Sequence, residues 1–186
     1  MISFADVGYF CFLAITIGWL SMASAAEKSP SAPVSQPVQT TNPSVSAVTQ
    51  AAVNAGVLSC AGRINQVTNF LSMGSQGTGA TLYVPAVDPD RKMISVSLEI
   101  LNANMPSAYA GASFAPNQAN GCGAIYEAVA YWSMKCGEVA AKQFAGLKQS
   151  GVMRKEITML DGGPELKVFL MPAGSGCISI KKEVVQ

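Results

Sequence analysis

The cysteines of this 186-residue chain constrain its fold more than any other feature. One of the five, Cys11, lies inside an apolar run near the start, and the other four lie well beyond it. An even number of cysteines in an exported chain is typical of a disulfide framework. A Cys₄ zinc site needs closely spaced pairs of cysteines, which do not occur. The sequence therefore predicts two disulfides, and neither a metal site nor a reactive thiol, among Cys60, Cys122, Cys136 and Cys177.

Residues 1–25 have the pattern of a signal peptide. Residues 7–20 form an uncharged apolar run, and Ala23 and Ala25 provide the small residues that a cleavage site requires. The uncharged stretch is also just long enough to span a membrane, so an uncleaved anchor is the alternative. Both interpretations predict that the rest of the chain is exported, either into the periplasm or out of the cell if the organism is bacterial.

Residues 26–50 are predicted to form a disordered tether. They are rich in proline, serine, threonine and glutamine, and they contain few large apolar side chains that could offset the entropy of ordering. Apolar periodicity begins at residue 51, and the remaining length fits one domain. We therefore expect a single disulfide-bonded domain over residues 51–186.

Two segments have the spacing of amphipathic helices. Apolar residues recur every three or four positions in both, which places them along one side of a helix. The first segment contains Val53, Val57, Cys60, Ile64, Val67 and Leu71. The second begins near residue 121, contains Cys122, Ile125, Val129, Trp132, Cys136 and Val139, and continues to Leu147.

Alternating apolar and polar residues predict the first two of five strands, and breaks rich in turn residues delimit the last three. These are residues 80–84, 94–100, 152–160, 166–171 and 177–185. Residues 102–120 have no clear period and are expected to form a long loop. The predicted order is α-β-β-loop-α-β-β-β. This is an α+β fold in which two amphipathic helices pack on an antiparallel sheet of about five strands, with two disulfides.

The helix assignment limits how the cysteines can pair. Cys122 and Cys136 would lie about 21 Å apart along one helix, which is too far for a disulfide. Two pairings then remain, because each of these cysteines must bond to either Cys60 or Cys177. If the last three strands form a meander, the final strand starts near the C-terminal end of the second helix, closest to Cys136. We therefore prefer Cys60–Cys122 together with Cys136–Cys177.

The sequence lacks residue types that most catalytic sites require. Histidine is absent, which excludes histidine-based triads and histidine-ligated zinc. Carboxylates are present, but no spacing singles out a pair for acid–base chemistry. The 12 basic and 11 acidic residues nearly balance, so there is no electrostatic reason to expect nucleic acid. We predict no catalytic residue, no cofactor and no metal, and membrane contact only through an uncleaved N-terminal segment.

The sequence favours a non-enzymatic binding or assembly protein that docks to another protein through a loop or a sheet edge. Candidate contact residues are Tyr109 and Phe114 in the expected loop, and Tyr131, which points away from the apolar side of the second helix. The alternative for the two loop aromatics is packing onto the domain itself. Two other functions stay open. One is a hydrolase that acts on cell-wall sugar or peptide through carboxylates, and the other is a subunit whose apolar surface is buried in an oligomer.

Overall fold

The computed structural model describes residues 45–103 and 106–186, so the leader and most of the expected tether lie outside the described residues. The helices of the described part are α1 (Ala47–Asn54), α2 (Ala61–Ser72), α3 (Cys136–Gln143) and the short 3-10 helix η1 (Pro89–Arg91). Its strands are β1 (Gly77–Tyr83), β2 (Ile94–Leu101), β3 (Ala108–Asn117), β4 (Gly121–Trp132), β5 (Lys148–Val152), β6 (Thr158–Asp161), β7 (Leu166–Ala173) and β8 (Gly176–Val185).

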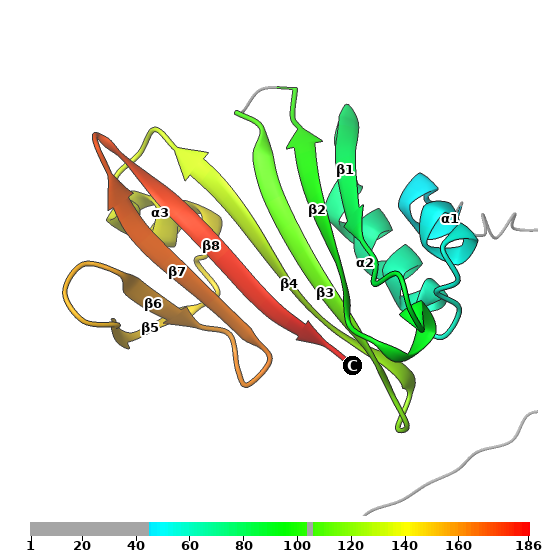
Figure 1. Ribbon diagram of the computed structural model, residues 1–186. Helices are drawn as coiled ribbons and strands as arrows, with labels where there is room; N and C mark the ends of the chain where they lie inside the picture. Colours follow the sequence, from blue (N-terminus) through cyan, green and yellow to red (C-terminus); the bar gives the residue numbers. More distant parts are fainter. Residues whose placement is uncertain (1–44, 104–105) are drawn as a thin grey trace, which may run out of the picture. The chain divides into compact units, whose positions relative to one another are not determined.

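The strands of the described residues form one antiparallel sheet of eight, in the order β1-β2-β3-β4-β8-β7-β6-β5. Strands β4 and β8 pair at the centre, and β1 and β5 are the two edges. Figure 1 shows α1, α2 and α3 on the same side of this twisted sheet. The expectation of two helices on about five strands is therefore wrong, because the structure has three helices and eight strands.

The first part of the second expected helix is a strand. Residues 121–132 form β4, and only α3, which follows it, is helical. Along β4, Cys122, Ala124 and Tyr126 are buried and the residues between them are less buried, which is the two-residue period of a strand. Apolar residues such as Ile125 and Val129 also occupy the opposite side of the strand. The sequence therefore satisfies the helical spacing and the strand spacing at once.

Two further segments differ from the expectation. The first helix is divided into α1 and α2, and Gly56 has a positive φ of 88° just after α1 ends. Helix α1 begins inside the range expected to be tether, with Ser46 accepting a capping hydrogen bond from the backbone of Thr49. The expected long loop contains β3, which pairs with β2 and β4. Its alanines and glycine have low strand propensity, and pairing on both sides overrides it.

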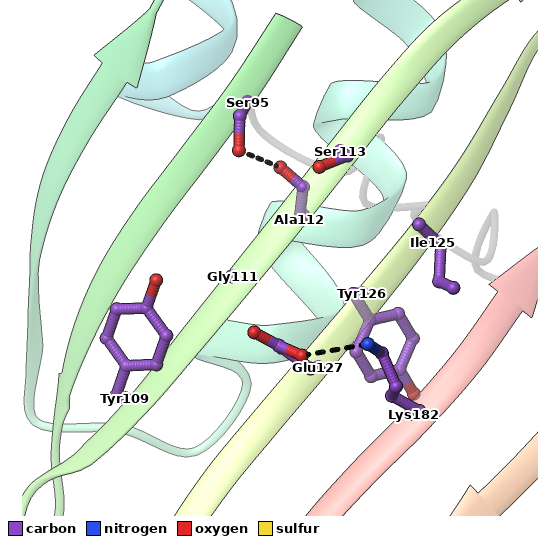
Figure 2. A pocket seen from close by; sticks show the side chains of 9 residues that line it. All are labelled: Ser95, Tyr109, Gly111, Ala112, Ser113, Ile125, Tyr126, Glu127 and Lys182. Carbon is purple, nitrogen blue, oxygen red and sulfur yellow. Dashed lines mark hydrogen bonds and ion pairs between the residues drawn. The ribbon is translucent and has the colours of Figure 1, made fainter.

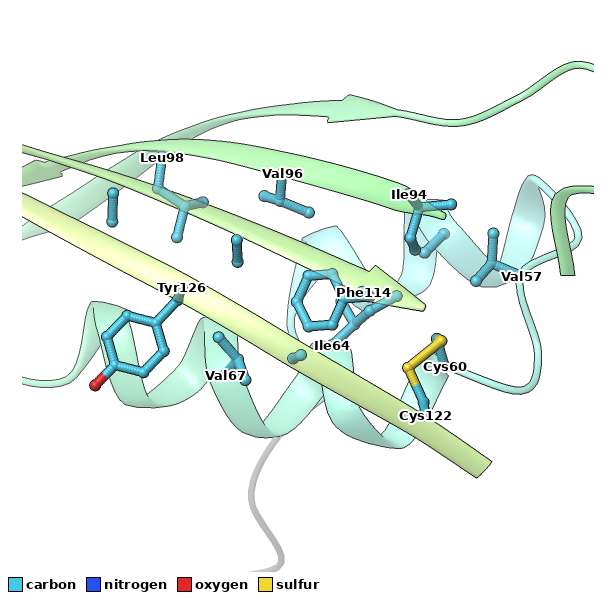
Figure 3. Close-up of a cluster of buried hydrophobic side chains, with 14 of the residues drawn as sticks. Val57, Cys60, Ile64, Val67, Ile94, Val96, Leu98, Phe114, Cys122 and Tyr126 are labelled. Atoms are coloured by element: carbon cyan, nitrogen blue, oxygen red, sulfur yellow. A yellow bond between two sulfur atoms is a disulfide. The ribbon is translucent and has the colours of Figure 1, made fainter. Parts of the chain in front are cut away.

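Two hydrophobic cores lie between the helices and the sheet. The larger packs α1 and α2 against β2, β3 and β4, and Ile64, Val96 and Phe114 within it are fully buried (Figure 3). The smaller packs α3 against β6, β7 and β8 around Val139 and Leu170. Both cores use the same side of the sheet. Within the described residues, the opposite side is therefore left without a helical layer.

One disulfide belongs to each core. Cys60 is bonded to Cys122, and Cys136 is bonded to Cys177. This is the pairing preferred from the sequence, although Cys122 and Cys136 are kept apart by the length of β4 and not by a helix. Two disulfides are typical of proteins that reside in an oxidising compartment.

The two bonds occupy equivalent places in two similar halves. In each half a helix, α2 or α3, is followed by four consecutive antiparallel strands. In each half a cysteine at the start of that helix is bonded to the second residue of the fourth strand. Glu127 lies five residues after Cys122, and Lys182 lies five residues after Cys177. The two residues are partners in the β4–β8 pair. An approximate twofold axis therefore passes between them.

Candidate binding site

We call the side of the sheet opposite the helices the open face. Strand side chains alternate between the two sides, and the pairing register determines which residues share a side. The open face carries the odd-numbered residues of β1–β4, β6 and β7 and the even-numbered residues of β8. The cores that involve α1, α2 and α3 all use the other side. No helix of residues 45–103 and 106–186 therefore covers the open face.

One half of the open face is apolar across β4, β8 and β7. Six residues form two rows that run from strand to strand, Val129–Ile180–Phe169 and Tyr131–Ile178–Met171. We call these six residues the apolar zone. Tyr131 is 42% exposed, and the other five are partly buried by their neighbours. A continuous apolar surface of this kind is typical of a contact with another molecule.

The other half of the open face is polar and holds a shallow pocket of about 190 Å³ (Figure 2). Gly111 lies between Tyr109 and Glu127, and its lack of a side chain leaves space between them. A Cβ atom added to Gly111 would lie only 3.2 Å from the Tyr109 hydroxyl. That hydroxyl is 3.1 Å from Oγ of Ser97. Glu127 and Lys182 form an ion pair of 3.2 Å beside it. The pocket therefore offers a carboxylate, an ammonium group and hydroxyls to the polar part of a partner.

A second pocket, of about 180 Å³, lies on the helix side of the sheet between α2 and β8, where Phe70 and Val185 line it. Tyr126 donates a hydrogen bond of 2.5 Å to Glu183 and accepts one of 2.7 Å from Lys181. Lys181 also pairs with Glu183 at 2.7 Å. Because these three polar groups satisfy one another, they act as a structural link between the two central strands.

This network changes the ionisation of two of its members. Burial raises the pKa of Tyr126 above its ordinary value, and the hydrogen bond to Glu183 and the charge of Glu183 raise it further. Partial burial alone would raise the pKa of Glu183. The hydrogen bonds from Lys181 and Tyr126 and the charge of Lys181 outweigh that effect, so the pKa of Glu183 lies below its ordinary value. At neutral pH the tyrosine is therefore a neutral donor and the glutamate is an anion.

Replacing Glu183 with glutamine is expected to destabilise the domain in a pH-dependent way. The folded-state pKa of Glu183 lies below the unfolded value of about 4.3, so its carboxylate stabilises the fold above that pH and loses this effect as the pH falls through the folded-state pKa. The side chain is one-third exposed, so we expect a loss of about 1 kcal/mol at pH 7. Urea denaturation of both proteins at pH 7 and pH 3 measures the difference, which should shrink at pH 3.

The matched control is Glu138→Gln, which removes the exposed pair between Glu138 and Lys142 on α3. Its expected effect at pH 7 is below about 0.5 kcal/mol, because exposed pairs of this kind contribute little. Equal losses for Glu183→Gln at pH 7 and pH 3 would contradict the assigned role of the ionised carboxylate.

Several other carboxylates of the described residues are held by structural partners. Asp90 accepts hydrogen bonds of 2.6 Å from the backbone N–H groups of both Leu58 and Ser59, and these bonds join the α1–α2 connection to the β1–β2 connection. Asp161 pairs with Lys167 at 2.6 Å. Within the described part of the chain, no cluster of three or more histidine, cysteine, aspartate or glutamate residues could hold a metal ion. These contacts indicate structural roles for the acids.

The structure places the three candidate contact residues in two different environments. Tyr109 and Tyr131 both lie on the open face and are 46% and 42% exposed. Tyr131 belongs to the apolar zone, and Tyr109 lines the polar pocket. Phe114 is fully buried in the larger core, so it packs onto the domain and is not available to a partner.

The sequence did not single out Glu127, Lys182 or the apolar zone. Glu127 was assigned to a helix, which hid the alternation that places it on the same side of the sheet as Tyr109. The alternation of Ile178, Ile180 and Lys182 is visible in the sequence of the last strand. Only the β4–β8 register, however, shows which residues these three lie beside.

No protein-family model matches this chain, and no curated protein or solved structure is significantly similar to it. Among the described residues, no helix has both the length and the apolar character needed to cross a membrane. The candidate binding site is therefore defined by the geometry of the open face.

Proposed function

We propose that this protein is an exported, non-enzymatic binding or assembly protein that docks to another protein through its open face. The observation that carries the proposal is the apolar zone, which lies beside the polar pocket on a side of the sheet that no described helix covers. Protein interfaces commonly combine an apolar centre that contains aromatic anchors with a polar rim. Tyr131 would be such an anchor, and Tyr109, Glu127 and Lys182 would form the rim.

The contacts of the acidic residues support a binding role over a hydrolytic one. Glu127 and Lys182 are both substantially exposed and neutralise each other, and Asp161 and Glu183 are likewise paired with lysines. An acid–base pair for glycoside cleavage would instead need two carboxyl groups that face each other across a substrate groove. The open face also carries Glu99 on β2 and Asp161 on β6, but Asp161 is paired with Lys167. Glu127 is the carboxylate that lines the shallow pocket.

Replacing Tyr131 with serine is expected to weaken the contact with the partner about tenfold or more. Truncation of an aromatic anchor at the centre of an interface typically costs more than about 1 kcal/mol. The measurement is affinity isolation from the exported fraction of the native organism, followed by titration of the recovered protein against wild type and variant. Tyr109→Ser tests the polar half in the same way.

Met73→Ser is the matched control, because Met73 is 74% exposed at the end of α2, away from the open face. It should recover the same protein as wild type with unchanged affinity, and a cooperative urea transition shows that each variant is folded. Recovery of the same protein with equal affinity by the two tyrosine variants would rule out docking through the open face.

A further inference from the structure

The two edges of the sheet differ, because only one of them carries features that prevent pairing. Strand β5 has five residues and begins with Lys148, and its pairing with β6 shifts register between Gln149 and Gly151. Short length, charge and bulges are the means by which proteins protect an exposed edge. Strand β1 has seven residues in continuous register with β2 and contains neither a charged residue nor proline. The β1 edge is therefore open to strand addition.

The surroundings of β1 are partly apolar, and Glu99 of β2 lies opposite Gly79. Helix α1, which contacts β1, has no charged residue. Thr78 and Ala80 point to the helix side and are nevertheless exposed, so α1 leaves the outer margin of the strand uncovered. A broad groove of about 520 Å³ lies at the end of β1. Its lining includes Tyr83 and Met93, which are 56% and 67% exposed. Backbone groups beside an apolar groove are what strand-addition sites offer.

We propose that β1 pairs antiparallel with β1 of a second copy of this chain about a twofold axis, which joins two eight-stranded sheets into one. With Ala80 at the axis, Tyr83 of one copy lies opposite Gly77 of the other, and Leu82 lies opposite Thr78. An aromatic ring opposite a strand glycine stabilises such a pair. A twofold axis brings each group close to its own copy, and a strand without charged residues places no like charges directly opposite each other.

This inference goes beyond docking on the open face, because it concerns a different surface of the molecule. The edge lies on β1, whereas the apolar zone lies on β4, β8 and β7. A dimer joined through β1 would present two open faces, so it could bind a partner bivalently.

The first test is a cross-link at Ala80. The full chain carries Cys11→Ser in this experiment, so that the introduced cysteine is the free thiol, and oxidised glutathione is the oxidant. Ala80→Cys should give a covalent dimer on a non-reducing gel, because opposite residues of an antiparallel pair lie within reach of a disulfide. Ser150→Cys on the β5 edge is the matched control and should stay monomeric, as should Cys11→Ser alone.

The second test measures mass by light scattering over a range of concentrations. Wild type should be dimeric, and Ala80→Lys should weaken dimerisation at least about tenfold, because it places two lysines opposite each other. Ser150→Lys should remain dimeric, and unchanged urea midpoints show that both variants are folded. A monomeric wild type, equal cross-linking at positions 80 and 150, or an unaffected Ala80→Lys dimer would each overturn the proposal. These outcomes leave docking on the open face unaffected, because they are measured without a partner.

Discussion

Replacing Gly176 with alanine is expected to destabilise the domain by about 3 kcal/mol, because the site has no room for a side chain. Gly176 is buried at the start of β8. An added Cβ would overlap the backbone carbonyl oxygen of Trp132 and lie 2.5 Å from the Tyr131 hydroxyl. The tyrosine can rotate away, but the carbonyl belongs to β4, the central partner of β8. Relief of the overlap therefore requires the two central strands to separate locally.

The measurement for Gly176→Ala is the urea midpoint of the oxidised protein. Gly62→Ala is the matched control, since Gly62 lies within α2 and no atom lies within 4 Å of its added Cβ. That control is expected to stabilise the domain by about 0.5–1 kcal/mol, because alanine favours helix. If the urea midpoint of Gly176→Ala equals that of the wild-type protein, the β4–β8 junction is looser than the structure indicates.

Removal of either disulfide is expected to cost about 4 kcal/mol. The bonds close loops over sequence separations of 62 and 41 residues, and the chain-entropy model assigns about 4 kcal/mol to each. The paired variants Cys60→Ala/Cys122→Ala and Cys136→Ala/Cys177→Ala test the bonds separately. Together the two bonds approach the whole net stability of many domains. Reduction of both is therefore expected to unfold the protein.

Urea denaturation of each paired variant, and near-ultraviolet circular dichroism of the reduced protein, measure these effects. The reoxidised wild-type protein should recover its original spectrum, which serves as the control for irreversible damage. A reduced protein that keeps its spectrum and a cooperative transition would show that the two cores are sufficient without covalent links.

Strands β3 and β4 are where the structure differs most from the sequence prediction. Both strands are rich in alanine and glycine, whose small side chains fit either side of a sheet and also a helix. Residues 121–132 therefore satisfied a helical period that the structure does not use. Strand β2 was correctly expected, because its apolar and polar residues alternate without exception from Ile94 to Ile100. The segment expected as one strand over residues 152–160 contains the end of β5 and the start of β6, which are joined by a turn.

The candidate site was only partly visible in the sequence for the same reason. Tyr109 and Tyr131 could be selected as aromatic anchors from residue type, but their common position on the open face follows from the register of β3 with β4. Phe114, which shares β3 with Tyr109, is on the opposite side and buried. A shift of one residue in that register would exchange their positions.

By itself, the sequence determined the disulfide chemistry and the alternation of the strands with a clear period. These properties depend on residue type and on neighbours along the chain. Tertiary structure alone decided that β4 pairs with β8. This pairing merges two half-domains into one sheet, in which no helix of the described residues covers the open face. Partners in this pair lie 45 to 61 residues apart in the chain. Their pairing depends on how whole surfaces fit, which a local period in the sequence does not determine.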